Sequence, residues 1–193
     1  MTSVLLLYAA FVSFTAIAAY TDLRTGLIPN RLIVVGLVLA LPLHAAVHFM
    51  VLRAAGDADG TVLLRALGYY TAGVIGCGLV PFILFRYNAM GGGDVKLLAM
   101  VGAFVGPMMG IEIQLYAFVL MALFAGARLA YQGQLLKLLS NSALLLVNPL
   151  RAKSRRRAVP EELLTSLRFA PAVFVSALLL TGLRLGLSRL GFA

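Results

Sequence analysis

Two aspartates stand in local sequences that could do chemistry. Asp22 begins the stretch DLRTGLIPN (22–30), and Asp94 ends the stretch GGGD (91–94), which VKLL follows. Two carboxyl groups held close together cannot both ionise cheaply, so they share one proton. The ionised member can take a proton from water, which attacks a carbonyl, while the protonated member donates to the carbonyl oxygen. This is general acid–base chemistry on a carbonyl group, and it requires a fold that brings Asp22 and Asp94 together.

The glycines before Asp94 have two interpretations. Gly91, Gly92 and Gly93 lack Cβ atoms, so the backbone there can approach a substrate chain closely or bend sharply into a helix. In hydrocarbon, such irregular backbone is tolerated only where protein or a water-filled cavity covers it. We therefore expect these glycines to shape a peptide-binding site; a flexible turn is the alternative.

Three further residues flank the aspartates. Asn30, which follows Pro29, is expected to cap the next helix rather than to act in catalysis. Lys96 could orient a substrate or Asp94, or it could extend its ammonium group toward the membrane surface. Pro29, Asn30 and Lys96 are thus predicted to shape the site.

The elements that must position these residues are membrane helices. Of the 193 residues, 62% are hydrophobic and 12% are charged, whereas soluble domains have about half apolar and about a quarter charged residues. The chain is expected to be all-α, a polytopic protein of about six transmembrane helices in a single domain over 1–193. The first uncharged run lacks a basic start and a cleavage site, so we expect it to be retained rather than removed as a signal peptide. The runs without charge are 1–21, 32–52, 66–85, 97–111, 113–127 and 169–183.

Basic residues predict the orientation. Twelve of the sixteen lysines and arginines lie in the loops 20–31, 86–96 and 128–168. Because basic loops stay in the cytoplasm, the N-terminus is predicted to lie outside. The run RAKSRRR (151–157) then lies against anionic lipid headgroups, and no nucleic-acid partner is expected. The twelve are Arg24, Arg31, Arg86, Lys96, Arg128, Lys137, Arg151, Lys153, Arg155, Arg156, Arg157 and Arg168.

The segment 134–150 is apolar but short between charges. We expect it to form a helix lying on the cytoplasmic surface; a seventh crossing is the alternative. Gly102, Gly106 and Gly110 recur every four residues and predict a face on which another helix packs closely.

No metal and no cofactor are expected. The lone cysteine, Cys77, excludes an intrachain disulfide and a cysteine-cluster zinc site. His44 and His48 share a helix face, but no third ligand is evident, so we expect them to be polar residues at the outer interface.

The topology puts Asp22 and Asp94 at the same cytoplasmic membrane depth. As alternatives, Asp22 could pair with Arg24 or Arg31, and Asp94 could be a helix N-terminal acid. Because Asp22 follows a helix C-terminus and Asp94 begins a helix, the dipoles suggest that Asp22 carries the shared proton.

These two stretches resemble those of the type IV prepilin leader peptidases. The resemblance implies an aspartic endopeptidase of the bacterial inner membrane with Asp22 and Asp94 as its catalytic pair. It also implies a small membrane protein with a basic leader as substrate, cut at the cytoplasmic face. RFAPAVFVSALLL (168–180) resembles the family's final span. The matching residues are Asp22, Ile28, Pro29 and Asn30, then Gly91, Gly93, Asp94, Lys96 and Leu97.

The chain also departs from the larger members of that family. These have two CxxC pairs and methylate the processed pilin, whereas this chain has one cysteine. Its short form resembles the branch that serves tight-adherence (Flp-type) pili. Two rival readings are a presenilin-like protease, which shares the glycine–aspartate stretch, and a non-peptidase transporter or pilus-assembly scaffold with structural acids. The sequence indicates no oligomeric state.

Overall fold

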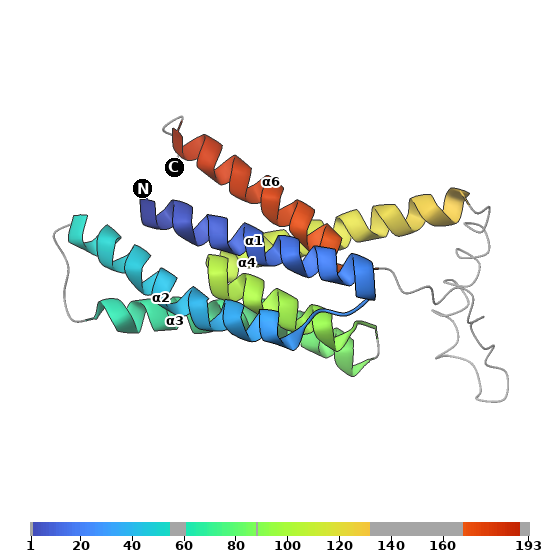
Figure 1. Cartoon of the computed structure of the whole chain (residues 1–193), viewed down its shortest axis with the longest axis horizontal. Helices are drawn as coiled ribbons and strands as arrows, with labels where there is room; N and C mark the ends of the chain where they lie inside the picture. Colours follow the sequence, from blue (N-terminus) through green and yellow to red (C-terminus); the bar gives the residue numbers. More distant parts are fainter. Residues whose placement is uncertain (1, 55–60, 88, 132–167, 190–193) are drawn as a thin grey trace, which may run out of the picture. The chain divides into compact units, whose positions relative to one another are not determined.

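The computed structural model describes residues 2–54, 61–87, 89–131 and 168–189. Within these ranges all regular structure is helical, which confirms the all-α prediction (Figure 1). The predicted surface helix over 134–150 lies outside the described residues. The helices are α1 (Thr2–Thr25), α2 (Asn30–Ala54), α3 (Val62–Arg86), α4 (Gly92–Tyr131) and α6 (Ala170–Arg189).

The helices have the length and surface of membrane segments. Four of those described, α1 to α4, are long and apolar enough to cross a bilayer, and α6 contains a shorter apolar helix over Ala170–Gly186. Large apolar side chains point outward, with Leu6, Val38 and Leu64 exposed by 63%, 67% and 71%. So much exposed apolar surface is stable in lipid and not in water. The protein is therefore a membrane protein.

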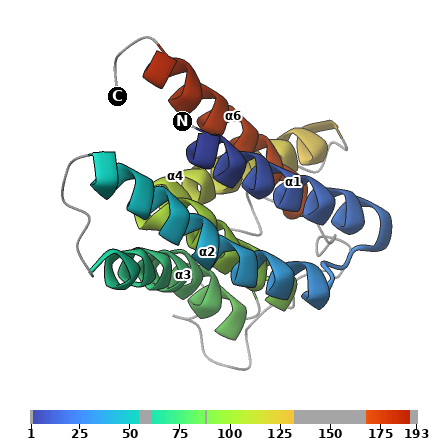
Figure 2. The same ribbon diagram turned by 60° about the vertical axis from the view of Figure 1, so that its left-hand side comes forward.

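The chain divides into two units, Met1–Phe118 with Arg168–Ala193, and Val119–Leu167. The described part of the second unit is the end of α4. In the first unit, α1 packs against α6 and α2, and α2 packs against α3 (Figure 2). Phe104 of α4 lies between Phe11 and Phe14 of α1, with ring centroids 5.9 and 5.6 Å away. These rings form the centre of the apolar core.

α4 folds back on itself at Gly106. This residue has φ 76° and ψ 179°, a conformation that interrupts the helix and that glycine adopts without strain. A Cβ added at Gly110 would lie 3.2 Å from the Cα of Gly102, whereas eight residues of straight helix span about 12 Å. Figure 1 shows the change of direction within α4. The turn at Gly106 thus lies within the uncharged run 97–111, and the runs 97–111 and 113–127 belong to one interrupted helix. Six separate crossings are not confirmed.

The polar groups freed at this kink have neutral partners. Pro107 has no N–H to donate, and the Tyr69 hydroxyl donates to the Val105 carbonyl at 3.4 Å. The Cys77 thiol lies 3.9 Å from the Pro107 carbonyl oxygen. A Cβ added at Gly106 would collide with the Tyr69 ring. The kink is therefore covered by protein, as irregular backbone in a membrane must be.

The predicted glycine face packs closely on another helix, α3. Gly102 packs directly on Gly73 of α3, since a Cβ added to either would collide with the carbonyl oxygen of the other. Gly110 packs on Cys77 of the same helix. Gly106 also contacts α3, since a Cβ added at Gly73 would lie 3.1 Å from its Cα, although its positive φ interrupts the helix there.

The prediction for the histidines was wrong for His44. Its side chain is 3% exposed and lies edge-on against the Tyr69 ring, with centroids 5.4 Å apart. His48 packs on the same ring at 5.7 Å. Tyr69 of α3 buries the histidine that the pattern of α2 alone placed at the surface.

Candidate active site

Asp22 lies in the last turn of α1 and is held at three points. Its main-chain carbonyl accepts hydrogen bonds from the Gly26 amide at 2.9 Å and from Nη1 of Arg168 at 2.6 Å. Its carboxylate oxygen Oδ2 accepts a hydrogen bond from the Ala170 amide at 3.2 Å. Gly26 has φ +69° and ends the helix. With a side chain 6% exposed, Asp22 is a buried and fixed carboxyl group.

Asp94 lies in the first turn of α4. The Gly91 carbonyl accepts hydrogen bonds from the amides of Asp94 at 3.1 Å and Val95 at 3.3 Å, so Gly91 occupies the cap position of this helix. A Cβ added at Gly91 would lie 3.2 Å from Oδ2 of Asp94. The missing side chain therefore leaves room for the Asp94 carboxyl to turn back over the start of its own helix.

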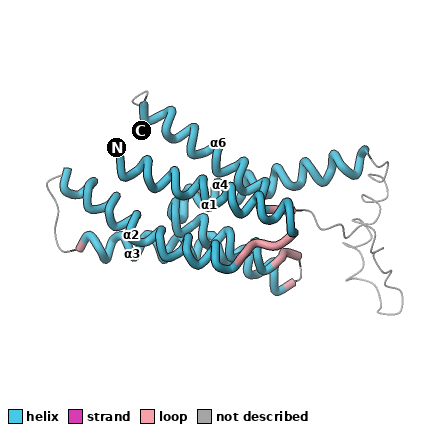
Figure 3. The backbone as a smooth tube through the Cα atoms, viewed as in Figure 1, coloured by secondary structure: helices cyan, strands magenta, loops and turns pink. Residues whose placement is uncertain are grey.

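The two motif stretches contact each other. The Lys96 ammonium donates to Oδ1 of Asn30 at 2.9 Å. A Cβ added at Gly93 would meet the Ile28 side chain at 3.6 Å, an ordinary van der Waals separation. Figure 3 shows the α1–α2 loop and the α3–α4 loop at the same end of the helices. Residues more than sixty positions apart thus form one local structure.

Asn30 does not occupy the cap position that we predicted for it, and its side chain contacts Lys96. The Pro29 carbonyl accepts hydrogen bonds from the amides of Leu32 and Ile33, so Pro29, and not Asn30, occupies the cap position of α2. Asn30 instead uses its side-chain oxygen to hold Lys96. Lys96 therefore joins the two stretches, because its ammonium reaches the α2 start.

The glycine stretch packs against the protein itself. A Cβ added at Gly92 would lie 3.4 Å from the Phe85 ring at the end of α3. With Ile28 beside Gly93, both glycines allow neighbouring side chains to close over the backbone. A Cβ at either position would make ordinary van der Waals contacts, so the packing at the start of α4 does not itself require glycine there.

The two carboxyl groups are electrostatically coupled. The charge of Asp22 acts on the Asp94 carboxyl. Two acids held close together can share a proton, because ionising both is costly. Arg24 does not neutralise Asp22, since its guanidinium lies over the Tyr20 ring, 5.0 Å from the ring centroid. The arrangement can thus present one acid and one base to a substrate.

Sequence reasoning missed Arg168 and Ala170. Both contact Asp22 from 146 and 148 positions away, which no local pattern reveals. The usable signal was Pro171, since proline is typical of a helix's first turn and marks where free amides point outward. In the described ranges no group of three His, Cys, Asp or Glu residues could hold a metal ion.

The comparisons with known proteins concern the stretch that contains both aspartates. The model of the type IV leader peptidase family matches residues 9–126. This chain belongs to the type IV leader peptidase family. The match includes Asp22 and Asp94 together with the stretches around them, whereas Arg168 and Ala170 lie outside the matched residues.

Two curated relatives are similar to this chain. It is 30% identical over 132 residues to the prepilin leader peptidase/N-methyltransferase of Bacillus subtilis, which covers 66% of this chain and 46% of that protein. It is 37% identical over 84 residues to the prepilin peptidase EppA of Methanothermobacter thermautotrophicus, covering 44% of this chain and 19% of that protein. The aligned part thus spans less than half of either relative. No solved structure matches the chain.

Proposed function

We propose that this family member is an aspartic endopeptidase that removes the leader peptide from a type IV, Flp-like prepilin. The observation that supports this most is the meeting of the two aspartate stretches. Lys96 bonds to Asn30, and the charges of Asp22 and Asp94 repel each other directly. Structural acids in a scaffold would each have a cationic partner, whereas the Asp22 carboxylate accepts its hydrogen bond from the Ala170 amide.

The reaction needs one proton and one water. The ionised carboxyl takes a proton from water, and the water oxygen bonds to the scissile carbonyl carbon. The protonated carboxyl donates to the carbonyl oxygen, which gives a neutral tetrahedral intermediate. The intermediate then loses its C–N bond as the leaving nitrogen takes the proton that the first carboxyl received from water. The other carboxylate takes a proton from a hydroxyl of the intermediate, and a new carboxyl and a new amine result. The pair returns to one acid and one base.

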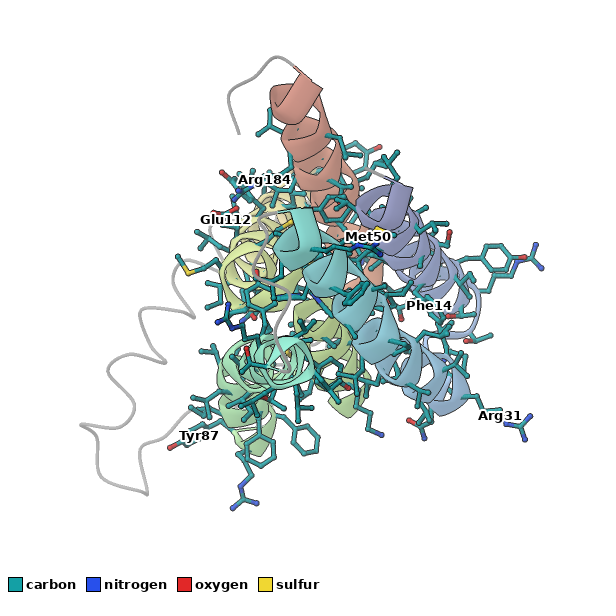
Figure 4. All side chains as sticks on the ribbon, turned by 90° about the vertical axis from the view of Figure 1, so that its left-hand side faces the viewer. Phe14, Arg31, Met50, Tyr87, Glu112 and Arg184 are labelled. Carbon is teal, nitrogen blue, oxygen red and sulfur yellow. The ribbon has the colours of Figure 1, made fainter. Side chains whose placement is uncertain are left out.

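The membrane orientation is part of the proposal. The basic loops favour a site on the cytoplasmic side of the inner membrane, with the N-terminus outside. The same assignment puts Glu112 and Arg184 together on the outer side, and they form an ion pair at 3.0 Å (Figure 4). The expected substrate is a small membrane protein whose basic leader meets its apolar helix at the cytoplasmic boundary.

The test is cleavage of a co-expressed short prepilin, read as a mobility shift. Replacing Asp22 or Asp94 with Asn should abolish cleavage in either variant alone, with the protein still inserted in the membrane. Glu112→Gln is the matched control, since it removes a carboxylate away from the site. Cleavage that survives in either aspartate variant would disprove the catalytic pair. Full cleavage loss in Glu112→Gln would show that any lost acid inactivates the protein.

A further inference from the structure

We propose that the start of α6 positions Asp22 and keeps it as the ionised member of the pair, which leaves the shared proton on Asp94. This inference rests on the proposed peptidase function. It reverses the assignment suggested by the helix dipoles in sequence, which considered only the helices that hold the two aspartates. Asp22 then accepts the proton from water, and Asp94 donates to the substrate carbonyl.

The direct contact is a hydrogen bond from main chain to side chain. The Ala170 amide is the first of α6, so it has no carbonyl partner within its own helix. It donates to Oδ2 of Asp22 at 3.2 Å in a buried setting. An amide can only donate, so the oxygen that receives this bond must offer a lone pair. Such a bond favours the ionised carboxyl over the protonated one.

The charge of Arg168 decides between the two aspartates. Asp94 lies at the N-terminus of α4 and Asp22 at that of α6, so the dipoles of these helices favour both anions alike. The C-terminus of α1 carries a partial negative charge of about half an elementary charge, which disfavours the Asp22 anion. Arg168 brings a full positive charge to the Asp22 main chain, 2.6 Å from its carbonyl oxygen. The balance therefore favours the anion at Asp22.

The other nearby cations have different contacts. Arg24 lies over the Tyr20 ring, and Lys96 donates to Asn30. Among the described residues, Arg168 is the basic side chain that hydrogen-bonds Asp22. Replacing Arg168 therefore tests the effect of its charge separately from the charges of Arg24 and Lys96.

The start of α6 is held firmly enough to position a side chain. Phe169 is buried, and its ring lies 5.2 Å from that of Phe118, centroid to centroid. Its carbonyl accepts hydrogen bonds from the amides of Ala172 and Val173 and so begins the helix. The Ala170 amide is therefore fixed before any substrate arrives, as a preorganised donor must be.

The first experiment separates turnover from binding for purified variants and a prepilin substrate. Ala170→Pro removes the amide hydrogen, and proline is well accepted at the first helical position. It should lower kcat about 10- to 100-fold, as expected for a lost bond to a charged group. Ala170→Gly retains the amide and should stay within about threefold of the wild type. KM should change less than about twofold throughout.

Arg168 is tested by charge. Arg168→Gln should lower kcat about tenfold, and Arg168→Lys should recover part of that loss because it retains the cation. Arg31→Gln is the matched control, since Arg31 extends away from the helices (Figure 4). Unchanged kcat in both Arg168→Gln and Ala170→Pro would overturn the proposal. A loss confined to KM, or to thermal stability, would also overturn it, by assigning Arg168 to substrate binding or to folding.

A second measurement needs no cleavage. The chain has four aspartates, so ¹³C-carboxyl labelling gives few signals, which single Asn variants assign. At neutral pH the Asp94 signal should have the shift of a carboxylic acid and the Asp22 signal that of a carboxylate. Arg168→Gln should move proton occupancy toward Asp22. A resting proton on Asp22 in the wild type would overturn this inference and leave the peptidase proposal intact. Failure of the wild type to cut any prepilin would instead overturn the peptidase proposal, whatever the carboxyl signals show.

Discussion

The two ends of the first arm of α4 both depart from regular helix, yet they are built differently. At Gly106 the freed polar groups meet neutral partners, the Tyr69 hydroxyl and the Cys77 thiol. At the other end, Asp94 meets the charge of Asp22. Where neutral groups hydrogen-bond the free polar groups of irregular backbone in a membrane, that backbone has a structural role. Where two like charges face each other, the cost of burying them indicates chemistry.

The kink and the site are nonetheless connected through the length of α4. Asp94 lies about twelve residues before Gly106, and Phe118 lies about twelve residues after it. Each of these segments corresponds to about 18 Å of helix. The fold at Gly106 therefore returns Phe118 to the level of Asp94. There Phe118 packs on Phe169, next to the Ala170 amide that holds Asp22. The kink thus determines the depth at which both aspartates and the start of α6 meet.

The largest effect is expected at the site. Asp22→Asn or Asp94→Asn should lower kcat about 10⁴-fold, since removing one member of a catalytic group costs nearly as much as removing all. The midpoint of thermal unfolding in detergent should stay within a few degrees, because Asn keeps the volume and an acceptor oxygen. Mobility-shift and unfolding assays on the same preparations check both. If a variant lost stability together with activity, the aspartates would have a structural role, like the groups at the kink.

A substitution at the Gly106 kink should lower stability but leave cleavage by the folded protein nearly unchanged. Gly106→Ala forces a side chain into a left-handed backbone and against the Tyr69 ring. The strain and the overpacking together should lower the free energy of unfolding by about 2–4 kcal/mol. Protein that remains folded should cleave with a kcat within a fewfold of the wild type.

Gly68→Ala is the control for this change, because a Cβ added there meets nothing within 4 Å. It should leave stability unchanged or raise it by up to about 1 kcal/mol. Equal stability of Gly106→Ala and Gly68→Ala would show that the kink is not a fixed feature of the fold.

Much of this organisation could be predicted from the sequence, for reasons that differ by region. The uncharged runs predicted α1 to α3 because a bilayer sets helix length. The stretches around Asp22 and Asp94 predicted the site because few residue types can do its chemistry. The return of α4 at Gly106 was not predictable, since the turn depends on Tyr69 and Gly73 of another helix. Pro171 marks the start of α6, but no local pattern shows that the Ala170 amide reaches Asp22.

A smaller effect is expected where Lys96 joins the two stretches. Lys96→Met or Asn30→Ala removes the 2.9 Å hydrogen bond at an exposed position. Either variant should lower kcat/KM about threefold to tenfold, because the bond aligns the α4 start with the α2 start. The double variant should be no worse than the poorer single one, with a coupling of about 0.5–1 kcal/mol in the cycle. Additive losses would mean that the two residues act separately.

The smallest effect is expected at the ion pair between Arg184 and Glu112. Arg184 and Glu112 approach to 3.0 Å, but both side chains are about half exposed, at 49% and 44%. Exposed pairs of this kind contribute about 0.2–1 kcal/mol, and salt screens them further. Arg184→Gln should therefore lower the free energy of unfolding by less than about 1 kcal/mol, with no change in kcat. Unfolding curves at low and high salt check this, since the difference from the wild type should shrink as salt rises. A cleavage defect in this variant would show that strain at the Arg184–Glu112 pair reaches the site, and the separation between structural and chemical regions would then fail.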